Sequence, residues 1–128
     1  MNTYLSKITL KVLNLKESEN FYDLVFKYLP LNKKEKVFND IHYWSSFGLM
    51  LSQQDDIVHM TSGSNRIGIV EYSIFISEKA VVDKIYQKLK EEKYKIFNKV
   101  EYYDYSPGYY SFKILDPDDN VVEFYTTD

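Results

Sequence analysis

The stretch SFKILDPDDNVVEFYTTD, residues 111–128, is the most informative part of the sequence. Two hydrophobic runs flank Asp-Pro-Asp-Asp-Asn, in which proline suits the second turn position and Asp and Asn tolerate left-handed backbone. This pattern predicts a β-hairpin. Side chains alternate between the two faces of a strand, so Val122 and Phe124 share one face and Glu123 lies on the other. A lone carboxylate in a strand that is otherwise suited to burial therefore needs an explanation.

Composition narrows the class of protein. The 128 residues are enough for one domain, and the proportions of hydrophobic (45%) and charged (27%) residues are ordinary for a globular protein. A net charge of −3 argues against nucleic acid as a partner. The sequence has no apolar run of membrane-spanning length and no signal-peptide core, so we expect a cytoplasmic protein without a membrane partner. With no cysteine, disulfides and thiolate ligands are excluded.

Strand and helix patterns repeat along the chain. We expect strands at 4–13, 35–44, 47–53, 69–76, 94–103, 109–115 and 120–126, and helices after Asn14 and after Ser77. An offset of 64 residues places Tyr22 on Tyr86 and Thr9 on Ser73. The chain therefore looks like two copies of a βαβββ unit, joined by the polar stretch TSGSN at 61–65.

Helix signals support this reading. Asn14 stands three residues before Glu17, which resembles a capping box, and Pro30 is expected to end the first helix. Ser77 is expected to cap the second helix. The predicted apolar stripe of that helix consists of Val82, Ile85, Tyr86 and Leu89.

Alternation places several polar residues on one face of the predicted sheets. Lys7 and Thr9 share a face of the first strand, and Glu71 and Ser73 share the corresponding face of strand 69–76. If the helices cover the apolar faces, these residues and Glu123 lie on the uncovered face. That face is where a cleft is expected.

Three segments carry a resemblance to a known family: KITLKVLNLKESENFY (7–22), RIGIVEYSIFISEKAVVDKIYQKL (66–89) and YSPGYYSFKILDPDDNVVEFY (105–125). They resemble the vicinal oxygen chelate superfamily, the glyoxalase, bleomycin-resistance and extradiol-dioxygenase group. The resemblance implies an α+β fold in which two tandem βαβββ modules, 1–61 and 66–128, form one glyoxalase-like domain with a cup-shaped mixed sheet and a central cleft. It also implies a homodimer.

The family's metal site is carried over only in part. Relatives typically hold a divalent metal with a histidine on the first strand, a histidine on the strand that opens module two and a glutamate on the last strand. Glu123 matches the glutamate, but Lys7 and Glu71 stand at the histidine positions. A protonated ammonium cannot ligate a metal. We therefore expect no cofactor, with Lys7 neutralising one or both glutamates; the alternative is Ni, Zn, Mn or Fe bound through Glu71 and Glu123.

Other residues are candidates for ligand contact. The family resemblance places Tyr43, Trp44 and Phe47 where relatives have cleft-wall aromatics, with core packing as the alternative. The segment SPGYY (106–110) resembles a loop that closes over the cleft, and alternation allows one of its two tyrosines to point inward. The candidate ligand-contacting residues are Tyr43, Trp44, Phe47, Arg66, Tyr109 and Tyr110. The two histidines, His42 and His59, lie at no family metal position.

Three functions follow from these residues. The preferred one is a metal-independent protein that binds a small organic molecule in an aromatic, acidic cleft. The first alternative is a metal-dependent lyase, isomerase, transferase or dioxygenase of the glyoxalase type. The second is a metal-free enzyme with Glu71 or Glu123 as general base and Lys7 as a cation for a developing oxyanion.

Overall fold

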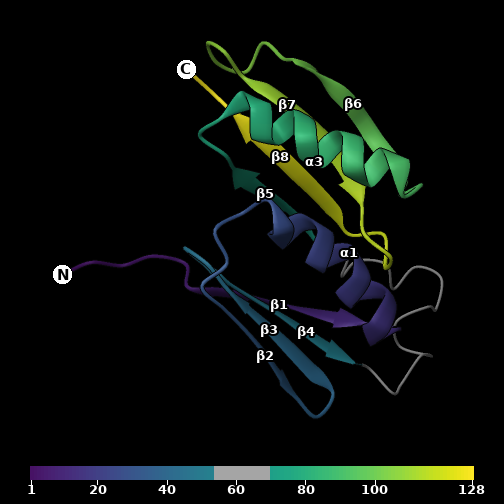
Figure 1. Ribbon diagram of the computed structural model, residues 1–128. Coiled ribbons are helices and arrows are strands. Elements are labelled where there is room, and N and C mark those ends of the chain that lie inside the picture. Colours follow the sequence, from purple (N-terminus) through teal and green to yellow (C-terminus); the bar gives the residue numbers. More distant parts are fainter. Residues whose placement is uncertain (54–69) are drawn as a thin grey trace. The chain divides into compact units, whose positions relative to one another are not determined.

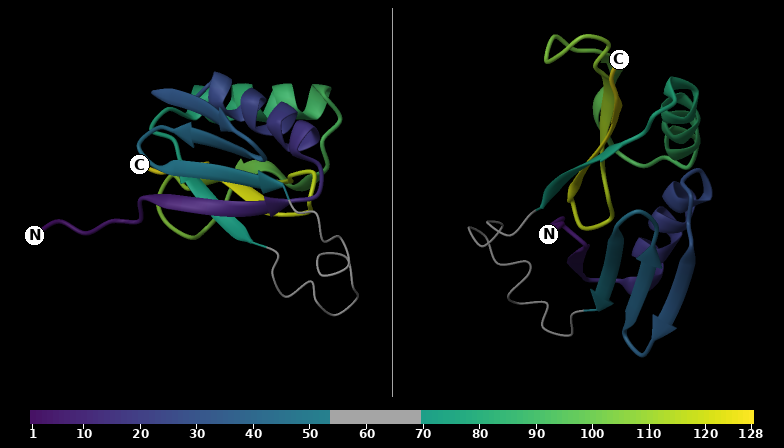
Figure 2. Two further views of the ribbon diagram at one scale, coloured as in Figure 1. Left: turned by 90° about the horizontal axis from the view of Figure 1, so that it is seen from below. Right: turned by 90° about the vertical axis from the view of Figure 1, so that its left-hand side faces the viewer.

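The computed structural model of the protein describes residues 1–53 and 70–128. The chain divides into two compact units, Met1–Gly68 and Ile69–Asp128. Among the described residues, each unit has one helix packed on one face of a four-stranded sheet (Figure 1). Figure 2 shows this layering for the second unit, where α3 lies on one side of its sheet.

Within residues 1–53 and 70–128, both units have the same order of elements, a strand, a helix and three strands. Module one consists of β1 (Lys7–Val12), α1 (Leu15–Lys27), β2 (Lys33–Val37), β3 (Asp40–Trp44) and β4 (Gly48–Gln53). Module two consists of β5 (Glu71–Phe75), α3 (Lys79–Glu91), β6 (Ile96–Tyr102), β7 (Tyr110–Leu115) and β8 (Val121–Thr126). The predicted fold class, two βαβββ modules, is confirmed.

The two sheets share one topology. Their strand orders are β1-β4-β3-β2 and β5-β8-β7-β6, and in each the first strand runs parallel to the last while the other pairs are antiparallel. The predicted repeat of 64 residues holds for the first half of each module. β1 begins at residue 7 and β5 at 71, and the helices run from 15 to 27 and from 79 to 91.

Two local predictions were wrong. The segment 35–44 is not one strand, because the chain turns at Phe38 and Asn39 and forms the β2–β3 hairpin. The turn has neither glycine nor proline, and Phe38 itself adopts a positive φ of 54°. The N-cap of α3 is Glu78 rather than Ser77, and its side chain makes no capping hydrogen bond.

The prediction for the first helix was correct. Asn14 is the N-cap of α1, and its side chain accepts a hydrogen bond from the backbone N–H of Glu17. The apolar stripes of both helices are buried against their sheets. Buried residues at these helix–sheet interfaces include Leu10, Phe21, Tyr22, Val25, Ile41 and Leu51 in module one and Ile74, Val82, Ile85, Leu89, Phe112, Val122 and Phe124 in module two.

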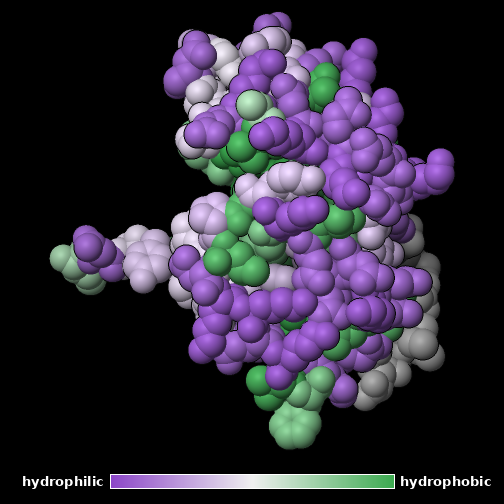
Figure 3. Space-filling model, in the orientation of Figure 1, coloured by the Kyte–Doolittle hydropathy of each residue, from purple (hydrophilic) through white to green (hydrophobic). Residues whose placement is uncertain are grey.

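The face shown in Figure 3 is mostly polar, and apolar side chains protrude from it at the tip of the β2–β3 hairpin. Val37 and Phe38 are exposed there, and Phe38 is fully accessible. No helix in the described part of the chain is long and apolar enough to cross a membrane.

Candidate functional site

Glu123 lies in β8, which is flanked by β5 and β7 in the module-two sheet. Its neighbours Val122 and Phe124 point to the helix-covered face and are fully buried, so Glu123 points to the opposite face. We refer to the face opposite a module's own helix as the helix-free face. In the strand register, Glu123 is paired with Ser73 of β5 and with Lys113 of β7.

Three hydroxyl groups hold the carboxylate of Glu123. The Ser73 hydroxyl donates to Oε1 at 2.6 Å. The Tyr109 hydroxyl and the Ser111 hydroxyl both donate to Oε2 at 2.9 Å. The side chain is only 5% exposed, and among the described residues no lysine forms an ion pair with it. The strand pairing and the hydroxyls together fix the position of a buried acceptor.

Tyr109 is a hydrogen-bond donor in this arrangement. Burial, followed by the hydrogen bond to Glu123 and the charge of that carboxylate, raises the pKa of the Tyr109 phenol well above its ordinary value. The phenol therefore stays protonated at neutral pH. Tyr109 is suited to donating a hydrogen bond and not to removing a proton from a substrate.

An ion pair lies on the same face, between Lys113 and Glu71. The Lys113 ammonium donates to Glu71 Oε1 at 2.6 Å and forms an ion pair with it. The hydrogen bond to Glu71, opposed by burial and reinforced by the charges of Glu71 and Glu123, raises the pKa of Lys113 above its ordinary value. Lys7, the predicted partner of the glutamates, is exposed in β1 of the other unit, beside Gly48 in the strand register. Its pairing with Glu71 or Glu123 stays a prediction.

Five aromatic rings run along the edge of this site. The ring of Phe75 contacts that of Tyr125 edge-on, with centroids 5.5 Å apart, and Tyr125 stacks on Tyr109 at 5.0 Å. Tyr109 in turn meets Tyr105 edge-on at 5.0 Å, and Tyr105 stacks on Tyr103 at 5.7 Å. We call this set the aromatic run. Exposed rings at Phe75 and Tyr105 leave apolar surface available to a ligand.

The loop between β6 and β7 positions Tyr109 through its backbone. Gly108 has a φ of +69°, and a Cβ at that position would collide with the side chain of Asp128. The backbone N–H of Asp128 donates to the Pro107 carbonyl at 3.2 Å. The segment SPGYY therefore needs glycine both for its backbone conformation and for this close approach.

The turn between β7 and β8 sets the register that brings Lys113 opposite Glu123. Asp116 Oδ1 accepts from the backbone N–H groups of Asp118 and Asn120, both at 2.9 Å. Asn120 Oδ1 accepts from the backbone N–H of Val70 at 3.1 Å, which ties the start of β5 to the turn. Asp119 has a φ of +64°, in the left-handed region that favours glycine.

Two of the candidate tyrosines point to the helices instead. Tyr110 alternates with Tyr109, and its hydroxyl donates to Asp83 of α3 at 2.5 Å. Tyr43 is fully buried, and its hydroxyl donates to Asp23 of α1 at 2.8 Å. Burial in the helix–sheet core leaves Tyr43 no accessible surface, so we do not include it in the site.

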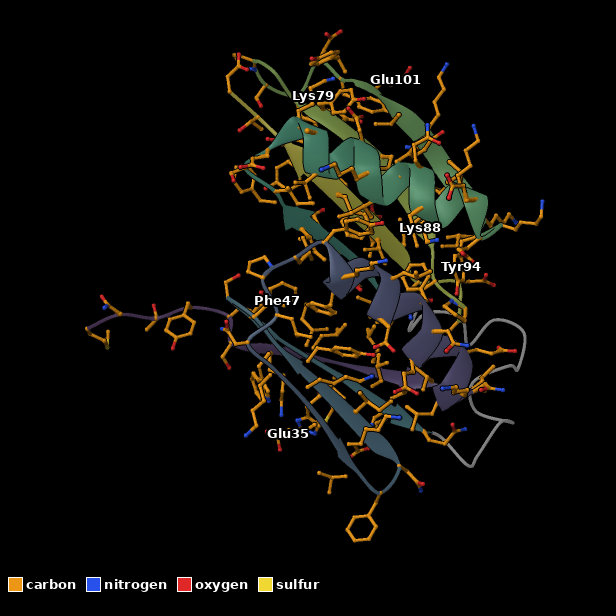
Figure 4. The ribbon with its side chains drawn as sticks, in the orientation of Figure 1. Glu35, Phe47, Lys79, Lys88, Tyr94 and Glu101 are labelled. Carbon is orange, nitrogen blue, oxygen red and sulfur yellow. The ribbon has the colours of Figure 1, made fainter. Side chains whose placement is uncertain are left out.

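The other candidates in module one are divided between the two faces. Phe47 packs toward α1, with its ring 6.1 Å from that of Phe26 (Figure 4). Trp44 alternates with the buried Tyr43, so it lies on the helix-free face, with its ring 6.1 Å from that of His42. The indole covers Gly48, where any Cβ would collide with it.

Arg66, His59 and the linker at 61–65 lie outside the described residues. The ligand-contact prediction for Arg66 therefore stays a prediction.

The side chains around Glu123 do not fit the family's metal site. Both of its oxygens accept hydroxyl hydrogen bonds, and the ammonium of Lys113 is bound to Glu71, the other candidate ligand. Within residues 1–53 and 70–128, no three or more His, Cys, Asp or Glu side chains lie together as a metal site. A cation beside the donor set repels a divalent metal, and two separate carboxylates are a poor set for a transition metal.

Sequence reasoning missed Lys113 and Ser111. Both lie in β7 on the face of Glu123, and counting outward from the Asp116–Asn120 turn places Lys113 directly opposite Glu123. The hairpin register was therefore available in the sequence as a signal. The aromatic run was harder to find, because Phe75 and Tyr125 meet only when β5 and β8 pair in parallel.

Comparisons with known proteins agree with this architecture. No protein-family model matches the sequence. No curated protein matches it either. Among solved structures, a candidate glyoxalase from Bacillus halodurans is 23% identical with a TM-score of 0.75, and the alignment covers 95% of this chain and 94% of that one.

Two further structures are similar over nearly their full lengths. A lactoylglutathione lyase from Agrobacterium tumefaciens is 20% identical with a TM-score of 0.68, covering 98% of this chain and 94% of that one. A glyoxalase/bleomycin resistance protein/dioxygenase family enzyme from Burkholderia phytofirmans PsJN is 15% identical with a TM-score of 0.76, covering 98% and 100%. The chain has the glyoxalase-like fold of these structures, built from two βαβββ modules.

Proposed function

We propose that the protein is a metal-independent binder of a small organic molecule, with the ligand held on the helix-free face of module two. The observation that carries the proposal is the environment of Glu123: a buried carboxylate, oriented by three hydroxyls, beside a run of partly exposed aromatic rings. Pockets for small molecules commonly combine apolar walls with a few fixed polar groups.

Each part of the face has a role in this proposal. The aromatic run supplies a flat apolar wall, with Tyr105 and Phe75 as its most accessible rings. The carboxylate of Glu123 supplies a hydrogen-bond acceptor whose position does not depend on the ligand. The Lys113–Glu71 pair lies beside it and supplies both a donor and an acceptor.

The proposal is tested by screening a library of small aromatic compounds in the presence of a chelator. We expect some of them to raise the melting temperature and to shift NMR signals of β5, β7 and β8. Replacement Y105A removes an accessible ring and should weaken the binding of such hits by about tenfold, a typical loss for one aromatic contact.

Replacement Y102A provides the matched control. Tyr102 is similarly exposed and belongs to the same module, but its ring contacts Tyr110 and Lys79 of α3. Binding should be unchanged in this variant. If no compound binds, or if both variants lose binding equally, the proposed site is wrong.

A metal titration separates this function from the glyoxalase-type enzyme. Calorimetry with Ni²⁺, Zn²⁺, Mn²⁺ and Fe²⁺ should show no stoichiometric binding, because Glu123 is held by hydroxyls and Glu71 by Lys113. Binding of one metal per chain, lost on replacement of Glu123 by Gln, would favour the lyase or dioxygenase alternative.

A further inference from the structure

Tyrosine–carboxylate pairs recur in this protein, and one of them lies between α1 and its sheet. The Tyr43 hydroxyl donates to Asp23 at 2.8 Å. Lys34 completes the group, since its ammonium forms an ion pair with Asp23 at 2.9 Å and lies 5.6 Å from the centroid of the Tyr43 ring. One cation thus serves both the carboxylate and the ring.

The second pair lies between α3 and its sheet. The Tyr110 hydroxyl donates to Asp83 at 2.5 Å. Lys79, at the N-terminal end of α3 (Figure 4), lies 3.6 Å from Asp83 and 4.3 Å from the centroid of the Tyr110 ring. This group also contains its own cation.

The third pair, Tyr109 and Glu123, has no such cation among the described residues. No described lysine lies over the ring of Tyr109 or over Tyr125, which stacks on it. Lys113 is the cross-strand neighbour of Glu123, but its ammonium is bound to Glu71. Glu71, Lys113 and Glu123 together therefore carry one net negative charge. Among the three carboxylates that accept from a tyrosine, Asp23, Asp83 and Glu123, the most buried is Glu123. It is also the one without a paired cation among the described residues.

We infer that the missing cation is supplied by the ligand, which is a protonated organic amine carrying an aromatic or other apolar group. This inference rests on the proposed function and specifies its ligand class. A buried carboxylate is stabilised by a paired cation, and aromatic ring faces attract cations through their quadrupoles. Both features are present at this site.

Hydrogen bonding gives the position of the amine. An ionised carboxylate offers about four acceptor sites. Glu123 Oε2 accepts two hydroxyl hydrogen bonds, whereas Oε1 accepts one, from Ser73. Because Ser73 is exposed, the remaining place on Oε1 is the one that an N–H donor from outside reaches first. The apolar part of the ligand then lies against the rings of Phe75 and Tyr125.

Three compounds of similar size and different charge test the inference: benzylamine, benzyl alcohol and benzoate. Titrations of the full chain are followed by NMR chemical shifts. We expect benzylamine to bind about tenfold more tightly than benzyl alcohol, and benzoate to bind most weakly, because an ion pair adds to the shared ring contact. Replacement of Glu123 by Gln should remove the preference for benzylamine and leave benzyl alcohol binding nearly unchanged.

Two controls keep the outcome interpretable. E101Q removes a more exposed carboxylate of β6 and should preserve the preference for the amine. The native protein is the second control, because its comparison of benzylamine with benzyl alcohol tests the role of the charge even if E123Q fails to fold. Loss of the preference in E101Q would overturn the assignment of the charge to Glu123.

Two further results would overturn the inference. Equal binding of the three compounds, sensitive to Y105A but not to E123Q, would leave the proposed function standing and exclude a cationic ligand. A tenfold gain in benzylamine affinity in R66A would mean that Arg66, outside the described residues, is already the cation of this site. Failure of every compound in the broader library would instead count against the proposed function.

Discussion

The helix-free faces of the two modules use equivalent backbone positions for different chemistry. In module one, Met50 of β4 is paired with Thr9 of β1 and with His42 of β3. In module two, the equivalent residue Glu123 is paired with Ser73 and Lys113. One fold repeat therefore carries a thioether where the other carries a carboxylate held by hydroxyls. The backbone supplies a position, and the side chains decide whether it becomes a polar site.

Placing the residue of module one at the equivalent position of module two should have the largest effect on stability. Replacement E123M removes the acceptor of three hydroxyls, one of them the buried Ser111. We expect the free energy of unfolding to fall by about 2 to 3 kcal/mol, since unsatisfied buried donors are costly. Urea denaturation measures it. The control E101M, at a more exposed position of the same sheet, should change stability far less; equal losses would show that the hydroxyls contribute nothing specific.

The charged contacts of the two helices offer the next largest difference. Glu19 of α1 and Asp83 of α3 are 64 residues apart and occupy equivalent positions, yet Glu19 is 4% exposed and contacts Lys34 and Lys36 at 2.8 and 2.6 Å. Replacement E19Q should cost about 2 kcal/mol, because it removes the charged acceptor of the hydrogen bonds from Lys34 and Lys36 at a buried position. Asp83 is partly exposed, so D83N should cost less than half as much; the reverse order would contradict the argument.

The pH dependence of this contact has a definite sign. Burial opposes ionisation of Glu19, but the hydrogen bonds from Lys34 and Lys36 and the charge of Lys34 outweigh it and lower its pKa from 4.5 to about 2. Because the folded-state pKa is the lower one, the stabilisation is present above about pH 4.5 and is lost as the pH falls toward 2. The stability difference between the native protein and E19Q should therefore shrink over that interval. A difference that is constant between pH 5 and pH 3 would exclude this linkage.

The reverse exchange in module one should have a smaller effect. Replacement M50E introduces a carboxylate opposite Thr9 and His42, where the strand pairing supplies one hydroxyl, that of Thr9, the counterpart of Ser73. We expect a loss of about 1 kcal/mol in urea denaturation, because Met50 is only half-buried and water can reach the new charge. M50Q is the control for lost packing. A gain in stability for M50E would mean that module one can form the same site.

The smallest effects on stability are expected from substitutions in the turns of the two modules. Phe38 in module one and Asp119 in module two both have positive φ, 54° and 64°. Replacement F38G should raise stability by about 1 kcal/mol and D119G by about 0.5 kcal/mol, because Asp tolerates this conformation better than a bulky residue does. Thermal unfolding measures both. F38A keeps the Cβ and should gain less than F38G; an equal gain would assign the effect to the exposed ring.

Much of the fold could be predicted because its signals are local. The Asn14 cap, the apolar stripe of α3 and the alternation around Glu123 each depend on a few neighbouring residues. The β2–β3 turn was missed because it contains neither glycine nor proline, and because Phe38 has a positive φ that a bulky residue rarely adopts.

The site was predictable only in part. Alternation correctly separated Tyr109 from Tyr110, but the family resemblance suggested Tyr43 as a cleft residue where the structure places it in the core. Whether a tyrosine in a strand points to the helix or to the opposite face depends on the orientation of the strand in the sheet, and the family resemblance does not specify this for Tyr43.

The sequence by itself determined the repeat, the helices and the face on which Glu123 lies, because period-2 and period-3.6 patterns follow from backbone geometry alone. Only the tertiary structure decided which groups surround that carboxylate. Ser73, Tyr109, Ser111 and Lys113 come from β5, β7 and the loop before it, and they meet Glu123 through strand pairing between residues that are 10 to 50 positions apart. Side-chain partners across a sheet depend on register, and register is a property of the packed sheet as a whole.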